Sequence, residues 1–386
     1  MSGALPRYLA VRGKTTELSA PLTPEDQVVQ AMPDASPTKW HLAHTTWFFE
    51  TFILVPGLRD YRLFDPAYGF LFNSYYNAIG QRQPRNQRGL LTRPGLQEIL
   101  AYRRHVDAAM EAFLQTSPGP DPALLELGLN HEQQHQELIL TDIKYLLGSQ
   151  PLKPAYRPAP TSAPTPAPPS KWIAFDEGLR AIGHGGKQFA FDNEGPRHKV
   201  FVNAFELASR PVSSGEYLEF MHDGGYAKPE LWLSDGWDAV RAQRWDAPLH
   251  WRKSEEGWKV FTLQGEQELD PGRPVCHLSH YEADAYARWA GARLPTEFEW
   301  EAASGHPAPA QTSGDVWEWT ASAYLPYPGF RIAEGAVGEY NGKFMSGQMV
   351  LRGGSVATPP GHIRPTYRNF FPPSARWQFS GLRLAR

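Results

Sequence analysis

The chain has 386 residues, which is long for a single hydrophobic core, so two domains are expected. Its net charge of −3 gives no reason to expect nucleic acid or an anionic membrane surface as a partner, and no apolar run is long enough to span a bilayer. The single cysteine, Cys276, excludes an internal disulfide framework, and the first residues lack a signal-peptide pattern, so a cytoplasmic location is expected.

Two helix starts occur early in the chain. Thr23-Pro24-Glu25-Asp26 joins a capping residue, a proline and two acids, which predicts a helix from Thr23. Ser36-Pro37 predicts a second helix through Phe52, and one face of it carries Trp40, His44, Trp47, Phe48 and Thr51. A histidine among aromatic rings needs a polar role, so His44 is a candidate metal ligand, favoured over His41 at the side of this face.

The segment between 56 and 94 loses helical periodicity. It is rich in glycine, asparagine, proline and aromatic residues, and it contains Tyr75, Tyr76, Arg85 and Arg88. A long irregular loop beside a metal site often carries function. An ordinary surface loop with packing tyrosines and solvated arginines would have the same composition, so the residues alone leave both interpretations open.

Two further helices are predicted over 94–115 and 122–147. In the second, His131 and His135 are four residues apart and therefore lie one turn apart on the same face, with Gln134 beside them. Two side chains of one helix can bind the same metal ion when they have this spacing. Four antiparallel helices with inward-facing ligands would form a metal site inside a bundle.

The same stretch fits the His-Glu-x-x-His zinc signature, with Glu132 as a general base. Zinc hydrolases of this kind need a third ligand, usually downstream of the helix. No Asp, Glu or His occurs between Asp142 and Asp176, so the third ligand is expected from an upstream segment. A zinc hydrolase or thiol transferase stays open as an alternative.

A proline-rich stretch separates the two halves of the chain. Residues 148–170 hold eight prolines and few apolar side chains, as is typical of a semi-extended linker. We therefore expect a helical domain over 1–150, a linker over 151–170 and a second domain over 171–386.

The second domain has a different pattern. Short apolar runs at 200–202 and 205–208 alternate with turn residues, and only 214–221 and 281–290 have a helical pattern. This mixture indicates an α+β domain, and the whole chain is predicted to be an α+β two-domain protein.

Four sequence blocks follow one another in the second domain: Gly291–Glu301, Gly314–Thr320, Leu351–Ser355 and Ser380–Arg383. Together they resemble the formylglycine-generating-enzyme-like (sulfatase-modifying-factor) domain, which implies a C-type-lectin-like α+β fold. Formylglycine-generating enzymes act through paired cysteines. This chain has one cysteine, so that chemistry is excluded, and a non-catalytic ligand-binding module on this fold is a further alternative.

The first domain, with His-Leu-Ala-His at 41–44 and His-Glu-Gln-Gln-His at 131–135, resembles a four-helix DinB-like bundle. The two domains in this order resemble the iron-dependent sulfoxide synthases of ergothioneine biosynthesis. The resemblance implies that His44, His131 and His135 hold a non-haem Fe(II). It also implies that the protein uses O2 to join the sulfur of a thiol to C2 of the imidazole of hercynine (Nα-trimethylhistidine), giving a sulfoxide.

The resemblance also assigns contacts to hercynine. Gln134 is expected to hydrogen-bond the substrate imidazole and to orient it. Asn369 is expected to contact the betaine, and Phe370 and Phe371 to face its trimethylammonium group, since quaternary ammonium groups bind aromatic faces. Core packing is the alternative role of the two phenylalanines.

The irregular loop gains two roles from the same resemblance. Arg85 and Arg88 match an Arg-x-x-Arg pair that holds carboxylates of the thiol substrate. One of Tyr75 and Tyr76 is expected to donate a proton during the oxygen chemistry and so to favour C–S bond formation over thiol oxidation, with Tyr340 as a weaker candidate.

The identity of the thiol depends on the residues after Asn369. In the branch that uses γ-glutamylcysteine, an aromatic residue and then an acid are expected, whereas Phe370 and Phe371 occur here. Without that carboxylate the glutamyl amine lacks a partner, so L-cysteine is favoured over γ-glutamylcysteine. The expected partners are small molecules, namely hercynine, cysteine and O2.

Overall fold

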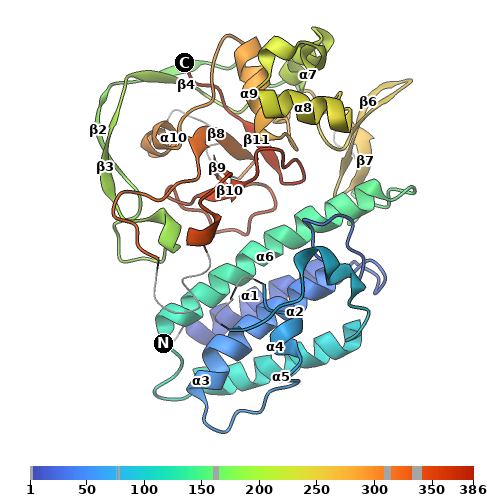
Figure 1. Cartoon of the computed structure of the whole chain (residues 1–386), viewed down its shortest axis with the longest axis vertical. Helices are drawn as coiled ribbons and strands as arrows, with labels where there is room; N and C mark the ends of the chain where they lie inside the picture. The colour runs from blue at the N-terminus through green and yellow to red at the C-terminus, as the bar shows by residue number, and fades with distance from the viewer. Residues whose placement is uncertain (1–2, 75, 77–78, 160–164, 308–313, 333–340) are drawn as a thin grey trace. The chain divides into compact units, whose positions relative to one another are not determined.

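The chain folds into two compact units, one ending at Arg157 and the other beginning at Pro158 (Figure 1). The computed structural model describes residues 3–74, 76, 79–159, 165–307, 314–332 and 341–386. We call the two parts the helical unit and the mixed unit. The expected α+β fold class is confirmed, and the domain limits at 150 and 170 stay predictions.

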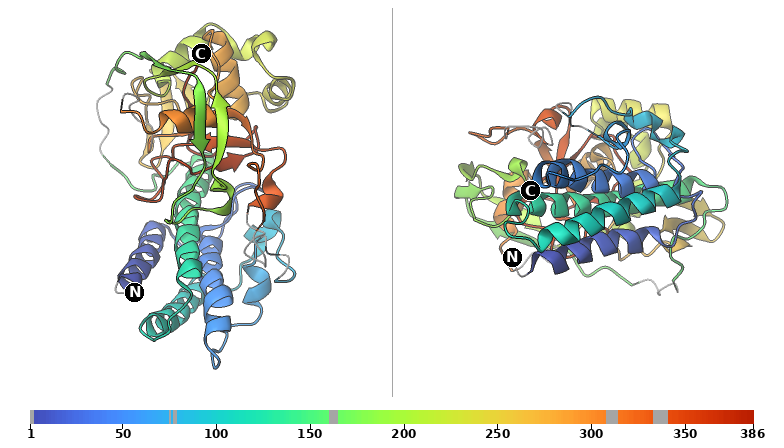
Figure 2. Two further views of the ribbon diagram at one scale, coloured as in Figure 1. Left: turned by 90° about the vertical axis from the view of Figure 1, so that its left-hand side faces the viewer. Right: turned by 90° about the horizontal axis from the view of Figure 1, so that it is seen from below.

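Four long helices build the helical unit: α1 (Ala4–Ser19), α2 (Thr38–Phe49), α5 (Leu96–Leu114) and α6 (Pro122–Ser149). α2 packs against α5 and α6, and α1 packs against α6, so the helices lie side by side as a bundle (Figures 1 and 2). The helices predicted over 37–52, 94–115 and 122–147 are confirmed.

Shorter helical segments connect the long ones. A π-helical turn, Glu50–Leu54, continues α2 into α3 (Val55–Gly57). The irregular segment that follows contains α4 (Tyr68–Leu71) and a 3-10 helix, Arg85–Leu90.

The helix predicted from Thr23 is wrong. Thr23 and Asp26 do cap each other, with N–H···O distances of 3.1 and 2.9 Å, but residues 24–28 form only turns. The first bundle helix is instead α1, whose buried face includes the polar residues Arg12, Thr15 and Ser19. These polar side chains interrupt the apolar period, so the sequence pattern does not reveal the helix.

In the part of the mixed unit that the structure describes, short strands form four small sheets. The largest has the order β10-β9-β8-β11, in which only the β8–β11 pair is parallel. The other sheets are β1-β4, β2-β3 and β5-β6-β7, all antiparallel. The strands are β1 (Trp172–Phe175), β2 (Gly178–Ile182), β3 (His198–Val202), β4 (Phe205–Ala208), β5 (Trp251–Ser254), β6 (Gly257–Thr262), β7 (Gly265–Glu268), β8 (Trp317–Ala323), β9 (Met349–Arg352), β10 (Asn369–Phe371) and β11 (Ser380–Leu382).

Buried ion pairs connect the four sequence blocks. Glu301 of the first block binds Arg352 of the third, and Glu318 of the second binds Arg383 of the fourth through two hydrogen bonds of 2.8 and 2.9 Å. All four side chains are almost fully buried. Because breaking one partner of a buried pair is costly, the blocks are tied to each other by charge as well as by strand pairing.

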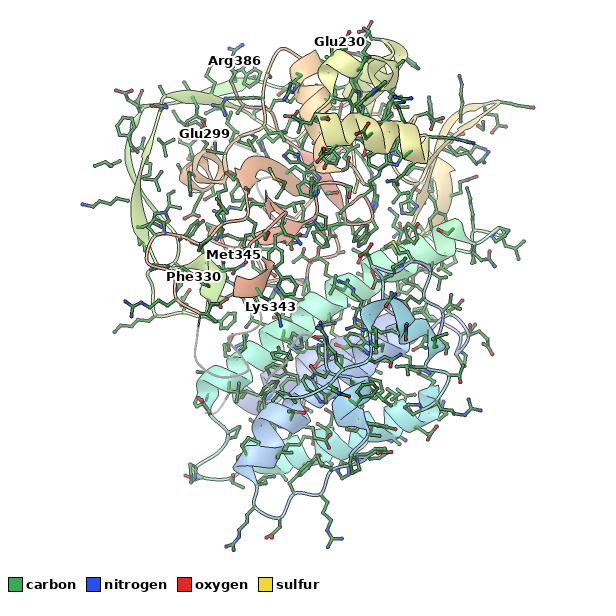
Figure 3. All side chains as sticks on the ribbon, in the orientation of Figure 1. Glu230, Glu299, Phe330, Lys343, Met345 and Arg386 are labelled. Atoms are coloured by element: carbon green, nitrogen blue, oxygen red, sulfur yellow. The ribbon has the colours of Figure 1, made fainter. Side chains whose placement is uncertain are left out.

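The described residues of the mixed unit also form four α-helices: α7 (Ser214–His222), α8 (Ser234–Gln243), α9 (His280–Trp289) and α10 (Glu297–Ala303). α7 and α9 match the sequence prediction, whereas α8 and α10 were not predicted. α10 has only seven residues and begins with a capping box between Thr296 and Glu299. Arg293 also donates to Glu299, over 2.7 and 2.8 Å, and Figure 3 labels this glutamate. Local caps rather than periodicity define this helix.

Candidate metal centre

Three histidines converge inside the helical unit. His44 comes from α2, and His131 and His135 come from α6. One nitrogen of each ring lies within 4.8 Å of those of the other two, and the side chains are 0, 2 and 6% exposed. The structure therefore brings together the three residues that the sequence suggested as metal ligands.

Hydrogen bonds orient the rings of His44 and His135, and the Nε2 atoms of His44 and His131 lie close together. His44 Nδ1 donates to the backbone carbonyl of Phe72 over 2.6 Å, so its Nε2 carries no proton in the neutral ring. This Nε2 lies 3.2 Å from Nε2 of His131. The Nδ1 atom of His135 lies 2.8 Å from Nδ1 of another histidine, His41. The nitrogen of His135 that stays available to a metal ion is therefore Nε2.

Burial keeps the three rings neutral. It lowers the pKa of His131 to about 3. Burial, and the repulsion that a second protonated histidine would add, also hold the pKa values of His44 and His135 well below their usual range. Neutral imidazole is the form that binds metals. The donor set fits a borderline divalent ion such as iron or zinc, because it offers three neutral nitrogens and leaves other coordination positions to substrates.

Flat side chains enclose the ring of His44. Trp40 stacks on it at 4.6 Å between centroids with an interplanar angle of 12°, and Trp47 lies at 5.6 Å and 18°. The guanidinium carbon of Arg88 lies 3.4 Å from the centroid of Trp40. The stack thus consists of four side chains, in the order Arg88, Trp40, His44 and Trp47. It fixes the plane of the His44 ring.

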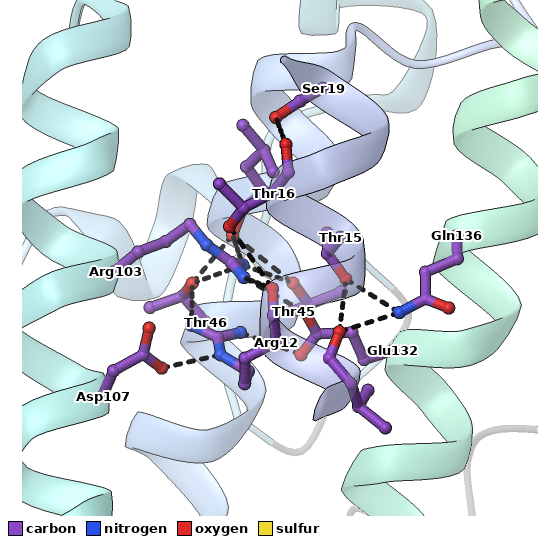
Figure 4. Close-up of polar contacts among 12 residues, drawn as sticks. Arg12, Thr15, Thr16, Ser19, Thr45, Thr46, Arg103, Asp107, Glu132 and Gln136 are labelled. Carbon is purple, nitrogen blue, oxygen red and sulfur yellow. Dashed lines mark hydrogen bonds and ion pairs between the residues drawn. The ribbon is translucent and has the colours of Figure 1, made fainter. Parts of the chain in front are cut away.

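Glu132 lies next to His131 in the chain but belongs to a different polar network (Figure 4). Arg12 donates to its carboxylate over 2.9 Å, and Arg103 over 3.2 Å. Despite burial, these guanidinium groups lower the pKa of Glu132 to about 2. A carboxylate bound between two cations is a poor proton acceptor near neutral pH, which argues against Glu132 as the general base of a zinc hydrolase.

The predicted arginine pair divides between two environments. Arg88 is buried and donates from Nη1 to Ser36 Oγ over 2.9 Å. Burial and the other histidines have the larger effects on the pKa values of His44 and His135, and the positive charge of Arg88 lowers both values further. Arg85 is exposed and donates to the backbone carbonyl of Asp34. Of the two, only Arg88 acts electrostatically on histidines of this cluster, namely His44 and His135.

The remaining candidates of the helical unit lie at different depths. Tyr76 is buried and packs against Trp47 at 5.6 Å and Phe52 at 5.0 Å between ring centroids. Gln134 is half-buried on α6. Tyr75 and Tyr340 lie outside the described residues.

Asn369, Phe370 and Phe371 form β10 in the mixed unit. Phe370 stacks on Tyr324 at 4.1 Å with an interplanar angle of 9°, whereas Phe371 is perpendicular to Trp377 at 5.9 Å. The side chain of Asn369 accepts from the backbone N–H of Phe370 over 2.9 Å. Phe370 also stacks with Phe344 at 5.9 Å and 27°, so Phe370 contacts two rings whereas Phe371 contacts one among the described ring pairs.

Sequence reasoning missed two residues near the histidines. It placed His41 at the side of its helix, yet His41 is buried and bonded to His135 and to Asp142. Asp142 lies seven residues after His135, two turns along the same face of α6, and this spacing is the one signal that could have revealed it.

Comparison with known proteins connects both units to known families. Residues 7–139 match the DinB superfamily, and residues 159–308 and 309–386 match the sulfatase-modifying factor enzyme 1-like domain. The chain is 33% identical over 403 residues to a hercynine oxygenase of Mycobacterium tuberculosis, covering 92% of this chain and 91% of that protein. A hercynine oxygenase of Mycolicibacterium smegmatis is also 33% identical, over 92% of each chain. Ergothioneine biosynthesis protein 1 of Schizosaccharomyces pombe is 28% identical over 51% of this chain and 28% of its own length.

None of the described helices combines the length and the apolar character that crossing a bilayer requires.

Proposed function

The chain belongs to the hercynine oxygenase family, and we propose that it is a non-haem Fe(II) sulfoxide synthase that couples L-cysteine to hercynine in ergothioneine biosynthesis. The observation that carries the metal assignment is the convergence of three buried, neutral imidazoles on one point of the bundle. His44, His131 and His135 would hold the ion through their Nε2 atoms.

The reaction balances with O2 as the sole oxidant. The thiol S–H and the C2–H bond of hercynine break, a C–S bond forms, one oxygen atom remains on sulfur and the other leaves as water. When bound, Fe(II) would supply the redox chemistry of O2 and would favour the thiolate form of the substrate sulfur. Binding, orientation and proton supply would fall to the side chains of this chain.

Substrate binding is assigned to individual residues by their chemistry. Gln134, one turn from His131 on α6, would hydrogen-bond the hercynine imidazole. Arg88 suits a substrate carboxylate, because its guanidinium is already held in place by Trp40 and Ser36. Arg85 would provide a weaker, exposed second contact.

The betaine end of hercynine is assigned to β10. Asn369 would contact it, and Phe370 and Phe371 would offer aromatic faces to the trimethylammonium group, a contact that contributes about 2 kcal/mol when desolvated. The perpendicular arrangement of Phe371 and Trp377 supports Phe371 as the main contact. The sequence Asn369-Phe370-Phe371 offers no carboxylate for a glutamyl amine, which supports L-cysteine over γ-glutamylcysteine.

Proton supply is assigned to the tyrosine pair. Tyr76 packs on Trp47, which itself stacks on His44, so one ring, that of Trp47, separates the tyrosine from a proposed ligand. A phenol at Tyr75 or Tyr76 would donate a proton and favour coupling over oxidation of the thiol alone.

A direct assay tests this function. The protein is incubated with Fe(II), O2, hercynine and an equimolar mixture of cysteine and γ-glutamylcysteine, and products are identified by mass spectrometry while oxygen uptake is recorded. We expect the cysteine-hercynine sulfoxide as the main product, with one O2 consumed per sulfoxide. Binding of iron without any coupled product from either thiol would overturn the proposal.

A further inference from the structure

A line of buried hydrogen bonds continues from His135 into the bundle. The Nδ1 atoms of His135 and His41 lie 2.8 Å apart, and His41 Nε2 lies 3.0 Å from Oδ2 of Asp142. The same carboxylate oxygen accepts the backbone N–H of Ser36 over 2.8 Å. His41 is 2% and Asp142 6% exposed, so water does not compete strongly for these contacts.

One arrangement of protons satisfies the whole line when His135 is a ligand. If Nε2 of His135 holds a metal ion, its proton must sit on Nδ1, which then donates to Nδ1 of His41. His41 accepts there, so its own proton sits on Nε2 and points at Asp142. The carboxylate is the terminal acceptor, and the N–H of Ser36 fixes its orientation.

The proposed ligand His44 is held differently. His44 donates directly to the carbonyl of Phe72, a neutral backbone group, over 2.6 Å. His135 is held through a second imidazole by an acidic side chain. A carboxylate at the end of such a line makes the ligating nitrogen more basic, which a carbonyl does less strongly.

We propose that His41 and Asp142 are positioning residues that fix His135 in its Nε2-ligating tautomer and thereby raise the affinity of the three-histidine site for a divalent metal ion. This inference rests on the proposed function, because it needs His135 to be a ligand. A purely structural alternative exists, since Ser36 precedes α2 and Asp142 lies on α6, so the contact also ties the start of one helix to the other.

Three variants of Asp142 and His41 separate the two roles. Asp142→Asn keeps an oxygen that can accept from Ser36 and His41 but removes the charge. His41→Leu removes the acceptor for His135, whereas His41→Asn, of nearly the same size as leucine, restores an oxygen near the position of Nδ1. His222→Leu, at an exposed position of the mixed unit, is the control for removal of a histidine.

The measurement is the affinity of the metal-free protein for Co(II), by competition with a chromophoric chelator, together with its visible spectrum and the free energy of unfolding of the metal-free form. We expect affinity to fall roughly 10-fold in Asp142→Asn and up to about 100-fold in His41→Leu, with partial recovery in His41→Asn. The unfolding free energy of metal-free Asp142→Asn should equal that of the wild type, and the spectrum should change only in the variants of the line.

Three outcomes would overturn the inference. Affinities within twofold of the wild type in both Asp142→Asn and His41→Leu would remove it while leaving the metal site intact. The variants could instead lose affinity in proportion to their loss of stability in the metal-free form, with no recovery in His41→Asn. In that case the hydrogen bonds of His41 and Asp142 would have a structural role alone. If the wild type bound no Co(II), or bound it equally well in His135→Ala, the metal site and the proposed function would fail with it.

Discussion

Arg12 donates to Glu132 over 2.9 Å at the centre of the helical bundle, and this contact joins two residues that are 120 positions apart in the chain. Arg103 binds the other carboxylate oxygen of Glu132 over 3.2 Å. The His-Glu-x-x-His string therefore contains a structural acid between two histidines that face elsewhere. Its role in the fold can be measured separately from catalysis.

Replacing Glu132 with alanine is expected to destabilise the protein by about 3–5 kcal/mol, because it leaves two buried guanidinium groups without their shared carboxylate. Urea unfolding of the metal-free protein measures this. Glu25→Ala, at an exposed position, should change the free energy of unfolding by less than about 0.5 kcal/mol. A Glu132→Ala protein of wild-type stability that lacks activity would instead restore the general-base interpretation.

Stability of the mixed unit should fall in mild acid because of His362. Burial, with a further contribution from Arg364, lowers the pKa of His362 to about 3, and neither ring nitrogen bonds to any residue that the structure describes. The unfolded chain binds a proton below about pH 6.5 whereas the folded chain resists it. The stability that neutral His362 contributes to the folded state is therefore fully present above pH 6.5, and it decreases as the pH falls towards 3.

Unfolding free energies at pH 6.5 and pH 5 test this effect. His362 alone accounts for a loss of about 2 kcal/mol over this interval, so His362→Leu should show a correspondingly smaller decrease than the wild type. His222→Leu, which removes an exposed histidine, should retain the wild-type decrease. Equal decreases in His362→Leu and wild type would mean that His362 is not kept neutral.

The arginine pair should contribute unequally to thiol binding. Arg88→Lys keeps the charge but loses the forked geometry and the contact with Trp40, so we expect KM for cysteine to rise roughly 10-fold. Arg85→Lys, at the exposed position, should have a smaller effect. Steady-state kinetics at saturating hercynine measures both, and a larger effect at Arg85 would contradict the assignment.

The tyrosine pair should control the outcome of the reaction. At least one of Tyr75→Phe and Tyr76→Phe is expected to lower the ratio of coupled product to oxidised thiol, by roughly 100-fold if it removes a general acid. Tyr68→Phe, a buried tyrosine of α4, is the matched control. Wild-type product ratios in both variants would remove the pair from the mechanism.

The sequence was sufficient to choose the three histidines that the structure brings together, because their placement on helix faces follows from helix geometry. His131 and His135 share a face of α6 wherever the helix begins and ends, and His44 lies on the aromatic face of α2. The contact between His41 and His135 could not be predicted in the same way. It depends on how α2 lies along α6, which no local pattern encodes.

The errors in the fold have a similar physical origin. α1 carries a buried polar face because Arg12 has partners on α2, α5 and α6, namely Thr46, Asp107 and Glu132. Only the assembled bundle makes such a face stable, so hydrophobic periodicity underestimates it. The capping signal at Thr23 was real, but the residues after it complete only a turn.

The most direct test of the account compares product formation by one protein sample loaded with different metals. Metal-free protein is reconstituted with Fe(II) or with Zn(II), supplied with O2, hercynine and cysteine, and assayed by mass spectrometry for the sulfoxide. The account predicts sulfoxide with Fe(II) and none with Zn(II), and none with Fe(II) in His44→Ala, His131→Ala or His135→Ala. Equal product from the Zn(II) protein, or from a variant that lacks one of these histidines, would contradict it.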